Sequence, residues 1–248
     1  MGLKTLVKDI VKRLGYDIIK RSNNIYNEDF LITWHNHHFM DNPYFSKAYE
    51  RGIKACEGDC KMHWRVHIAL WIASQAKKLS GDFVECGVNR GFLSSAIMTY
   101  ISWNSLNKNF FLFDTFCGLD QRYTTENEKK RAWLESYSEC YEKTKANFSE
   151  FKNVHLIRGT IPDILSDHSV STQIKNVCYL SLDMNCAKPE IAAADFFWDK
   201  LVSGAFVLLD DYTYCGYEEQ YRAFNSFAQR RNIEILSLPT GQGLFIKP

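Results

Sequence analysis

The sequence lacks an excess of charge of either sign. Its 248 residues hold 30 lysines and arginines against 29 aspartates and glutamates, which leaves a formal net charge of +1. Proteins that bind nucleic acids non-specifically carry a strongly positive field, and that field is missing here. We therefore expect no nucleic-acid partner.

Proline and long apolar runs are also scarce. The chain has 5 prolines, and no apolar stretch approaches the ~18 residues that a membrane-spanning helix needs. An aromatic fraction of 15% excludes a disordered or low-complexity protein. Because no signal peptide is visible, the 8 cysteines, mostly in apolar runs, indicate a reducing cytoplasmic location. No second cysteine pair accompanies Cys56 and Cys60, so a structural zinc site is not expected.

The first 61 residues predict a helical cap segment. Leu6, Ile10 and Leu14 share one stripe of an amphipathic helix over residues 1–20, with basic residues mostly opposite. Such a helix could bind an anionic membrane surface peripherally, but we favour docking on its own domain or on a second subunit. Residues 23–59 are irregular, aromatic and rich in histidine, which is typical of a lid. Most of these aromatic rings should pack on the core, although a sugar would also stack on them.

From residue 62 onward, after a helix expected over 62–78, strand-like and helix-like segments alternate. Strands are predicted at residues 82–88, 110–114, 154–158, 177–183, 205–210, 233–238 and 244–247. Helices are predicted at residues 92–103, 126–148, 161–165, 189–201 and 218–231. This alternation predicts an α/β fold, a doubly wound Rossmann-like sheet of seven strands, over residues 62–248. The last connection is too short for a crossover, so the last strand must be reversed.

Ligands of such sheets bind beyond the carboxyl ends of the strands, near the point where the strand order reverses. The first strand leads through Glu85 into a turn with two glycines, Gly87 and Gly91, where backbone could approach a ligand. The third glycine of the dinucleotide fingerprint is missing, which disfavours an NAD-dependent oxidoreductase and leaves S-adenosylmethionine. The second strand ends at Asp114, which could accept hydrogen bonds from ribose hydroxyls or could equally cap a turn.

Three carboxylates follow the fourth and fifth strands. Asp183 ends one, and Asp210 and Asp211 end the other. Neighbouring parallel strands would bring these groups together, which is costly unless protons or a cation neutralise them. Carboxylate oxygens are the ligands that Mg²⁺ prefers. The sequence therefore predicts a Mg²⁺ site, and the alternative is three unrelated turn aspartates.

Together these motifs resemble the macrocin O-methyltransferase family, a branch of the class I S-adenosylmethionine-dependent methyltransferases that act on sugar hydroxyls. The resemblance covers residues 62–248 and rests on residues 81–88, 112–119, 183, 207–212 and 238–244. It implies a cofactor site at the first three strand ends, formed by Glu85, Gly87, Gly91, Asp114, Thr115, Arg158, Gly159 and Thr160. The first three would hold the methionine end, Asp114 the ribose, and the residues from Arg158 on would lie near the adenine.

The resemblance also implies a mechanism. Mg²⁺ on Asp183, Asp210 and Asp211 would bind vicinal sugar oxygens, lower the pKa of the acceptor hydroxyl and align it with the methyl group. Asp183 and Asp211 are therefore the predicted catalytic residues, and a homodimer is a further expectation. We expect a Mg²⁺-assisted O-methyltransferase acting on a sugar of a glycan, glycolipid or glycosylated metabolite, with a catechol as a close variant. The rival is a non-catalytic cofactor-binding or scaffold protein of a glycan-assembly complex.

One position departs from the family pattern. Relatives show Asp-x-Asp at the fourth strand, with the second carboxylate as general base, whereas this chain has Asn185 there. An amide cannot accept a proton at useful pH. Activation by the metal could suffice, with the proton lost to solvent. Otherwise another group could be the base (His35, His37, His38 or Tyr212), or the protein could bind the cofactor without methylating.

Overall fold

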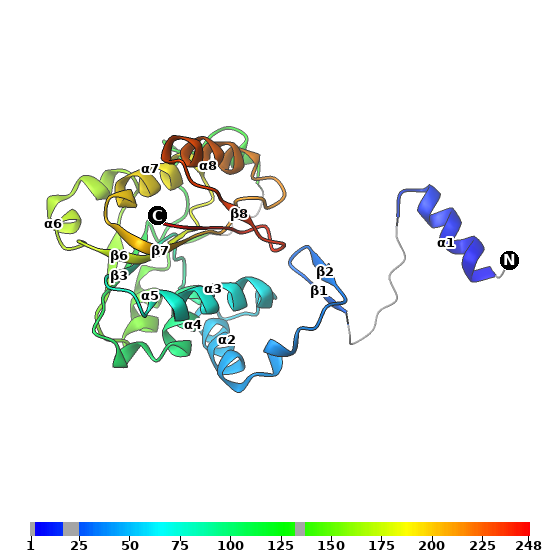
Figure 1. The fold of residues 1–248 in the computed structure, drawn as a ribbon, viewed down its shortest axis with the longest axis horizontal. Coiled ribbons are helices and arrows are strands. Elements are labelled where there is room, and N and C mark those ends of the chain that lie inside the picture. The colour runs from blue at the N-terminus through cyan, green and yellow to red at the C-terminus, as the bar shows by residue number, and fades with distance from the viewer. Residues whose placement is uncertain (1–2, 17–24, 132–136) are drawn as a thin grey trace. The chain divides into compact units, whose positions relative to one another are not determined.

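A computed structural model describes residues 3–16, 25–131 and 137–248 (Figure 1). The chain divides into an N-terminal unit, Met1–His37, and a sheet unit, His38–Pro248. The N-terminal unit holds helix α1 (Leu3–Arg13) and an antiparallel hairpin of β1 (Tyr26–Glu28) and β2 (Leu31–Thr33). The domain boundary predicted at residue 61 stays a prediction.

Helix α1 is shorter than the predicted helix, because the backbone leaves the helix at Leu14 and residues 17–20 lie outside the described part. Its stripe residues Leu6 and Ile10 are exposed. No helix in the described ranges is both long enough and apolar enough to cross a membrane. Contact with a membrane surface or a second subunit stays a prediction, as does the cytoplasmic location.

The sheet unit is built on seven strands in the order β5-β4-β3-β6-β7-β9-β8. They are β3 (Asp82–Cys86), β4 (Phe110–Asp114), β5 (Val154–Arg158), β6 (Val177–Leu182), β7 (Leu201–Leu209), β8 (Leu236–Ser237) and β9 (Gly243–Ile246). The first five are parallel, and β9 runs antiparallel to both β7 and β8. This confirms the predicted doubly wound sheet with a reversed last strand.

Helices cover both faces of this sheet (Figure 1). One face packs against α2 (Pro43–Cys56), α3 (His63–Ala76), α4 (Phe92–Tyr100) and α5 (Tyr141–Phe148). The other face packs against α7 (Ala187–Trp198) and α8 (Glu218–Arg231). Side chains of β3 alternate between the two cores, because successive strand residues point to opposite faces: Phe83 enters the first and Val84 the second. Short helical segments complete the unit: η1 (His38–Asp41), η2 (Trp103–Ser105), η3 (Glu128–Lys130), η5 (Asp163–Ser166) and α6 (His168–Ser171).

The prediction of an irregular lid up to residue 59 is wrong for α2. Asn42 caps this helix by accepting hydrogen bonds from the backbone N–H groups of Tyr44 and Phe45, and Pro43 occupies the first helical turn. Phe45 and Tyr49 are buried in the core, where Tyr49 stacks on His63 with ring centroids 3.8 Å apart. Aromatic residues of the predicted lid therefore pack in the core of the sheet unit.

The predicted continuous helix over residues 126–148 is also wrong. The chain forms only η3 and α5 there, with Arg131 and residues 137–140 outside any helix and residues 132–136 outside the described part. The buried carboxylate of Glu128 accepts hydrogen bonds from the N–H groups of Thr125 and Ala187. The first of these bonds is local, whereas the second joins Glu128 to the start of α7, a contact that helix propensity does not predict.

Strand β3 lies at the point where the strand order reverses, because it pairs with β4 on one side and β6 on the other. The chain beyond β3 passes very close to the end of β6. A Cβ atom built on Gly87 would lie 1.7 Å from the carbonyl oxygen of Asp183. The structure thus gives Gly87 a packing role at this crossing, independent of any ligand.

We expect Gly87→Ala to destabilise the chain far more than Gly204→Ala. Both glycines have positive φ, +93° and +83°, so both replacements cost about 1 kcal/mol in backbone strain. At Gly204 the nearest atoms to a new Cβ are side-chain carbons of Leu79, 3.8 Å away. The backbone overlap at residue 87 should raise its cost to about 3 kcal/mol or more. Urea unfolding measures both, and equal losses would contradict the close-approach explanation.

Candidate functional site

The carboxyl ends of β3 to β7 meet at one edge of the sheet, and the predicted site residues divide between two parts of that edge. The predicted cofactor residues follow β5, β4 and β3, whereas the three aspartates follow β6 and β7. Because β3 and β6 are neighbours, the two parts adjoin at the reversal point. The topology therefore places the predicted cofactor residues (the cofactor part) beside the three aspartates (the acidic part).

Asp114 holds the two turns of the cofactor part together. Its Oδ2 accepts hydrogen bonds from the N–H groups of Val88 (2.6 Å) and Asn89 (2.7 Å), and its Oδ1 accepts one from Phe116 (2.6 Å). This is the turn-capping role that the sequence left open. The Thr115 hydroxyl lies 3.4 Å from the same Oδ1, so turn contacts engage both oxygens of Asp114, and a ribose contact stays a prediction.

The other predicted cofactor residues lie around these turns. Gly91 is the N-cap residue of α4. The Thr115 hydroxyl donates to the carbonyl of Gly118, and the N–H of Gly159 donates to the carbonyl of Asp114. Arg158 is exposed and pairs with Glu139 at 2.5 Å. The backbone carbonyl of Thr160 accepts a hydrogen bond from the N–H of Ile164. Contact of these residues with the cofactor stays a prediction.

Glu85 lies inside the sheet edge, between the two parts. Its side chain is buried, and its Oε2 has no hydrogen-bond partner among the described residues. Burial, with a smaller contribution from the negative charges of Asp210 and Asp114, raises its pKa to about 8, although an interaction with the Ser94 hydroxyl acts in the opposite direction. This carboxyl is therefore largely protonated at neutral pH, and its free oxygen could receive a polar group of a bound cofactor.

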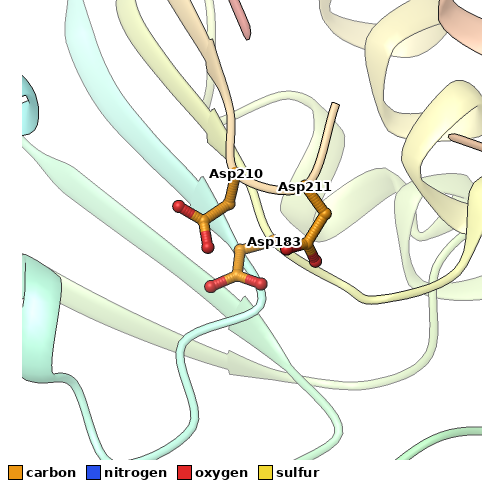
Figure 2. A group of neighbouring side chains, drawn as sticks. All are labelled: Asp183, Asp210 and Asp211. Atoms are coloured by element: carbon orange, nitrogen blue, oxygen red, sulfur yellow. The ribbon is translucent and has the colours of Figure 1, made fainter. Parts of the chain in front are cut away.

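Asp183, Asp210 and Asp211 form a single cluster, which Figure 2 shows at the ends of β6 and β7. One oxygen of each lies within 4.8 Å of the others. Burial and the neighbouring carboxylates raise the pKa of Asp183, and burial, followed by the charge of Asp210, raises that of Asp211 to about 7. The Oδ2 atom of Asp211 is buried without a partner in the described chain. These features fit a divalent cation, which would offset the repulsion and satisfy this oxygen.

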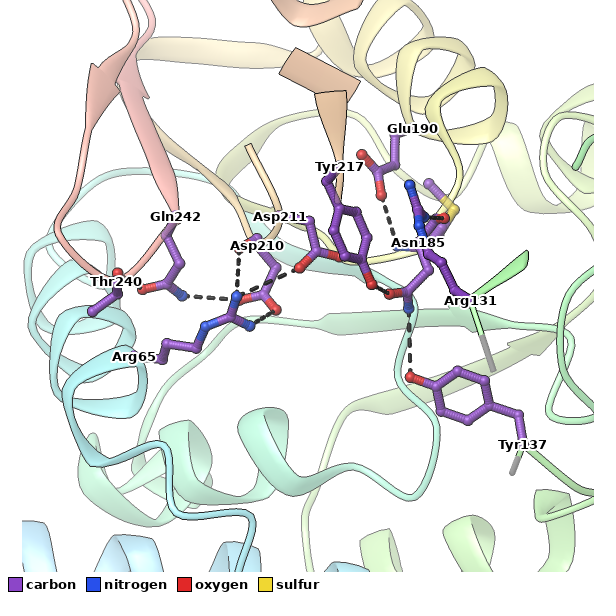
Figure 3. A network of polar contacts seen from close by, with 11 residues as sticks. Arg65, Arg131, Tyr137, Asn185, Glu190, Asp210, Asp211, Tyr217, Thr240 and Gln242 are labelled. Atoms are coloured by element: carbon purple, nitrogen blue, oxygen red, sulfur yellow. Dashed lines mark hydrogen bonds and ion pairs between the residues drawn. The ribbon is translucent and has the colours of Figure 1, made fainter. Parts of the chain in front are cut away.

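A buried arginine, Arg65, also enters this cluster, although no sequence motif marks it. Arg65 of α3 donates from Nη1 to Asp210 Oδ2 at 2.5 Å, and its Nη2 lies 3.4 Å from Asp211 Oδ1 (Figure 3). Gln242, before β9, donates to the other oxygen of Asp210 at 2.9 Å. No local pattern marks Arg65, because 145 residues separate it from Asp210. Gln242 belongs to one of the segments that carry the family resemblance.

Asn185 is the centre of a second set of contacts (Figure 3). The Tyr217 hydroxyl donates to its Oδ1 at 2.6 Å, and its Nδ2 lies 3.5 Å from the Tyr137 hydroxyl. Arg131 donates to its backbone carbonyl at 2.7 Å and stacks over the Tyr217 ring at 3.7 Å. Asn185 is therefore fixed beside the aspartates as a hydrogen-bonding group.

Among the predicted alternative bases, Tyr212 is hydrogen-bonded to a residue of α8. Its hydroxyl donates to Asn225 at 3.1 Å, and burial raises its pKa, so the phenol stays protonated at neutral pH and is not available as a base. His38 lies exposed in η1 of the sheet unit. His35 and His37 belong to the N-terminal unit, and their role stays a prediction.

Comparison with known proteins identifies the family. The family model for macrocin-O-methyltransferase matches residues 67–236, more than half of the chain. The chain belongs to this family. It is thus an S-adenosylmethionine-dependent O-methyltransferase, as the resemblance implied. A search of curated proteins found no match.

Solved structures of other methyltransferases share the fold. The O-methyltransferase NovP is 18% identical, with a TM-score of 0.62 over 74% of this chain and 79% of NovP. The calicheamicin methyltransferase CalS11 is 15% identical, with a TM-score of 0.57 over 82% of this chain and 93% of CalS11. The Podospora anserina methyltransferase PaMTH1, solved with S-adenosylhomocysteine, is 12% identical, with a TM-score of 0.52 over 88% and 99%. At these identities the likeness concerns the fold alone.

The raised pKa of Glu85 predicts how the stability of the methyltransferase depends on pH. The folded state keeps a proton that the unfolded chain has released, so the free energy of unfolding falls as pH rises from the ordinary value of 4.5 toward about 8. Between pH 5 and pH 8, we expect this fall to be smaller in Glu85→Gln by on the order of 3 kcal/mol. Urea unfolding in EDTA measures it. The exposed Glu150 serves as control, since Glu150→Gln should keep the wild-type profile, and an equally steep profile in Glu85→Gln would contradict the assignment.

Proposed function

We propose that this methyltransferase transfers the methyl group of S-adenosylmethionine to a sugar hydroxyl, with Mg²⁺ bound at the acidic cluster. The observation that carries the proposal is the cluster itself: three carboxylates beside the cofactor part, with the buried Oδ2 of Asp211 unpartnered in the described chain. The sugar acceptor is supported by the family and by CalS11, whose structure is described as a TDP-rhamnose 3'-O-methyltransferase.

The reaction needs an acceptor oxygen aligned with the methyl group. The oxygen attacks the methyl carbon, the carbon–sulfur bond breaks, S-adenosylhomocysteine leaves, and the hydroxyl proton goes to solvent. Mg²⁺, when bound, lowers the pKa of a coordinated hydroxyl. The Asp183 and Asp211 carboxylates would hold the cation, since one oxygen of each lies within 4.8 Å of the other and Asp211 Oδ2 is unpartnered in the described chain.

Asn185 would position the acceptor without taking its proton. Its amide oxygen is engaged by Tyr217, and its NH₂ group faces Tyr137. Burial raises the pKa of both tyrosines, so their hydroxyls stay protonated and can donate hydrogen bonds. Because Tyr217 already donates its only hydroxyl proton to Asn185, the NH₂ group of Asn185 is a donor left for a sugar oxygen, and this set of groups offers no base. Activation by the metal remains the first explanation for this departure.

Removal of the metal tests the first part of the proposal. We expect EDTA to abolish methyl transfer to nucleotide-sugar acceptors and added Mg²⁺ to restore it. Asp183→Ala should lower the rate by about 100-fold or more, because a ligand of the cation is lost, while S-adenosylhomocysteine binding by calorimetry stays within about threefold. Asp195→Asn, which alters an exposed carboxylate on α7, is the matched control and should stay active.

The outcomes separate the parts of this proposal. Activity that survives both EDTA and Asp183→Ala would remove the metal and leave the methyltransferase. Transfer to catechols but to no sugar would replace the acceptor class. A chain that binds no S-adenosylhomocysteine would overturn the whole proposal and favour the non-catalytic alternative.

Restoring the carboxylate at position 185 tests the second part. We expect Asn185→Asp to be no faster than the wild type, because an added negative charge beside Asp183 and Asp211 is costly and the NH₂ contact to Tyr137 is lost. Asn185→Ala, which removes both tyrosine contacts, should be slower by about tenfold. Methyl transfer from labelled S-adenosylmethionine measures both. A tenfold gain in Asn185→Asp would show that a missing base limits the rate.

A further inference from the structure

Asp210 is held from two sides by residues that lie far apart in the sequence. Arg65 reaches it from α3, with its Nη1 on Oδ2 at 2.5 Å and its Nη2 on the backbone carbonyl at 3.1 Å. Gln242 reaches Oδ1 from the turn between β8 and β9 at 2.9 Å. All three residues are buried, and Gln242 is fully inaccessible. Both oxygens of Asp210 are therefore fixed in direction.

The turn that carries Gln242 is itself rigidly attached. The Thr213 N–H donates to the Gly241 carbonyl at 2.7 Å, which joins this turn to the chain that follows Asp211. Thr240 donates from Oγ1 to the Gln242 side-chain oxygen at 3.0 Å. This contact decides the orientation of the amide, because it leaves the NH₂ group facing Asp210. The segment at residues 238–244 therefore contributes the Gln242 contact to Asp210.

Arg65 also determines which oxygen of Asp211 faces the cluster. Its guanidinium lies over the Tyr214 ring at 4.5 Å, and its Nη2 is 3.4 Å from Asp211 Oδ1. With Oδ1 directed toward the arginine, Oδ2 is the unpartnered atom. The planar guanidinium can contact both aspartates at once, which an ammonium group cannot do with the same geometry.

We propose that Arg65 and Gln242 are positioning residues of the acidic cluster: they orient Asp210 and Asp211 so that a divalent cation finds its ligands already placed. The proposal rests on the proposed function, in that the ligand of the cluster is a cation. Residues that orient metal ligands typically change metal affinity by 10- to 100-fold when they are replaced.

The direction in which metal affinity changes when Arg65 is replaced distinguishes a positioning role from simple charge balance. If Arg65 were only a counter-ion that competes with the metal, its removal would tighten metal binding, because a repulsive positive charge disappears. If Arg65 positions the ligands, its removal weakens binding despite the lost repulsion. Arg65→Lys keeps the positive charge but cannot contact Asp210 and Asp211 with the same geometry, so it should also weaken metal binding.

Mn²⁺ serves as the probe, with its affinity for the full-length chain measured by electron paramagnetic resonance and by calorimetry. We expect Arg65→Met, Arg65→Lys and Gln242→Leu each to weaken Mn²⁺ binding by about tenfold. Arg51→Met is the matched control, since Arg51 also pairs with a carboxylate (Glu150, 2.8 Å) and lies 5.5 Å from an aromatic ring, away from the cluster. It should change the Mn²⁺ affinity by less than about twofold.

Several results would overturn the proposal. Tighter binding in Arg65→Met would make Arg65 a competing counter-ion, and unchanged binding in Arg65→Lys and Gln242→Leu would remove the positioning role. Gln242→Leu keeps the test valid if the arginine variants fail to fold. A wild-type chain that methylates its acceptor but binds no Mn²⁺ would remove the metal from both proposals, whereas wild-type affinity in every variant would overturn this one alone.

Discussion

The burial of several carboxyl groups at one edge of the sheet is the constraint on which the rest of the site depends. Burial raises the pKa values of Glu85, Asp183, Asp211 and Glu190. Each charge placed there requires a donor or a partner of opposite sign, because isolated buried charges cost several kcal/mol. The surrounding loops and helices are arranged to supply these partners.

Different carboxyl groups receive different partners. Asp114 and Glu128 accept hydrogen bonds from backbone N–H groups of the turns that they connect. Glu190 accepts one from the N–H of Met184, next to Asp183. Asp210 accepts hydrogen bonds from the guanidinium of Arg65 and from the side-chain amide of Gln242. Asp211 and Glu85 each keep one buried oxygen without a partner in the described residues, so both are places where a bound group could complete this edge.

The helices on one face of the sheet therefore do more than cover it. Helix α3 packs on the core through Val66, Leu70 and Ala73, and the same helix directs Arg65 into the acidic cluster. Helix α2 buries Phe45 and Tyr49, so aromatic residues expected in a lid belong to the core that holds α3 in place. The stability of this core and the geometry of the cluster are thus linked.

Local patterns in residues 62–248 predicted the order of the sheet strands, the reversed last strand and the two sets of strand-end residues, although they did not predict α2 or the break after residue 126. These features follow from local periodicity and from the rule that parallel strands share their carboxyl ends, so Asp114, Asp183, Asp210 and Asp211 could be located without coordinates. The tertiary structure decided the partners. The contacts of Arg65, Gln242, Tyr137 and Tyr217 join segments far apart along the chain, and such contacts leave no local pattern. The predicted helix after residue 126 gives way to η3, where the buried carboxylate of Glu128 accepts one local hydrogen bond from Thr125 and one long-range hydrogen bond from Ala187, which no local pattern reveals.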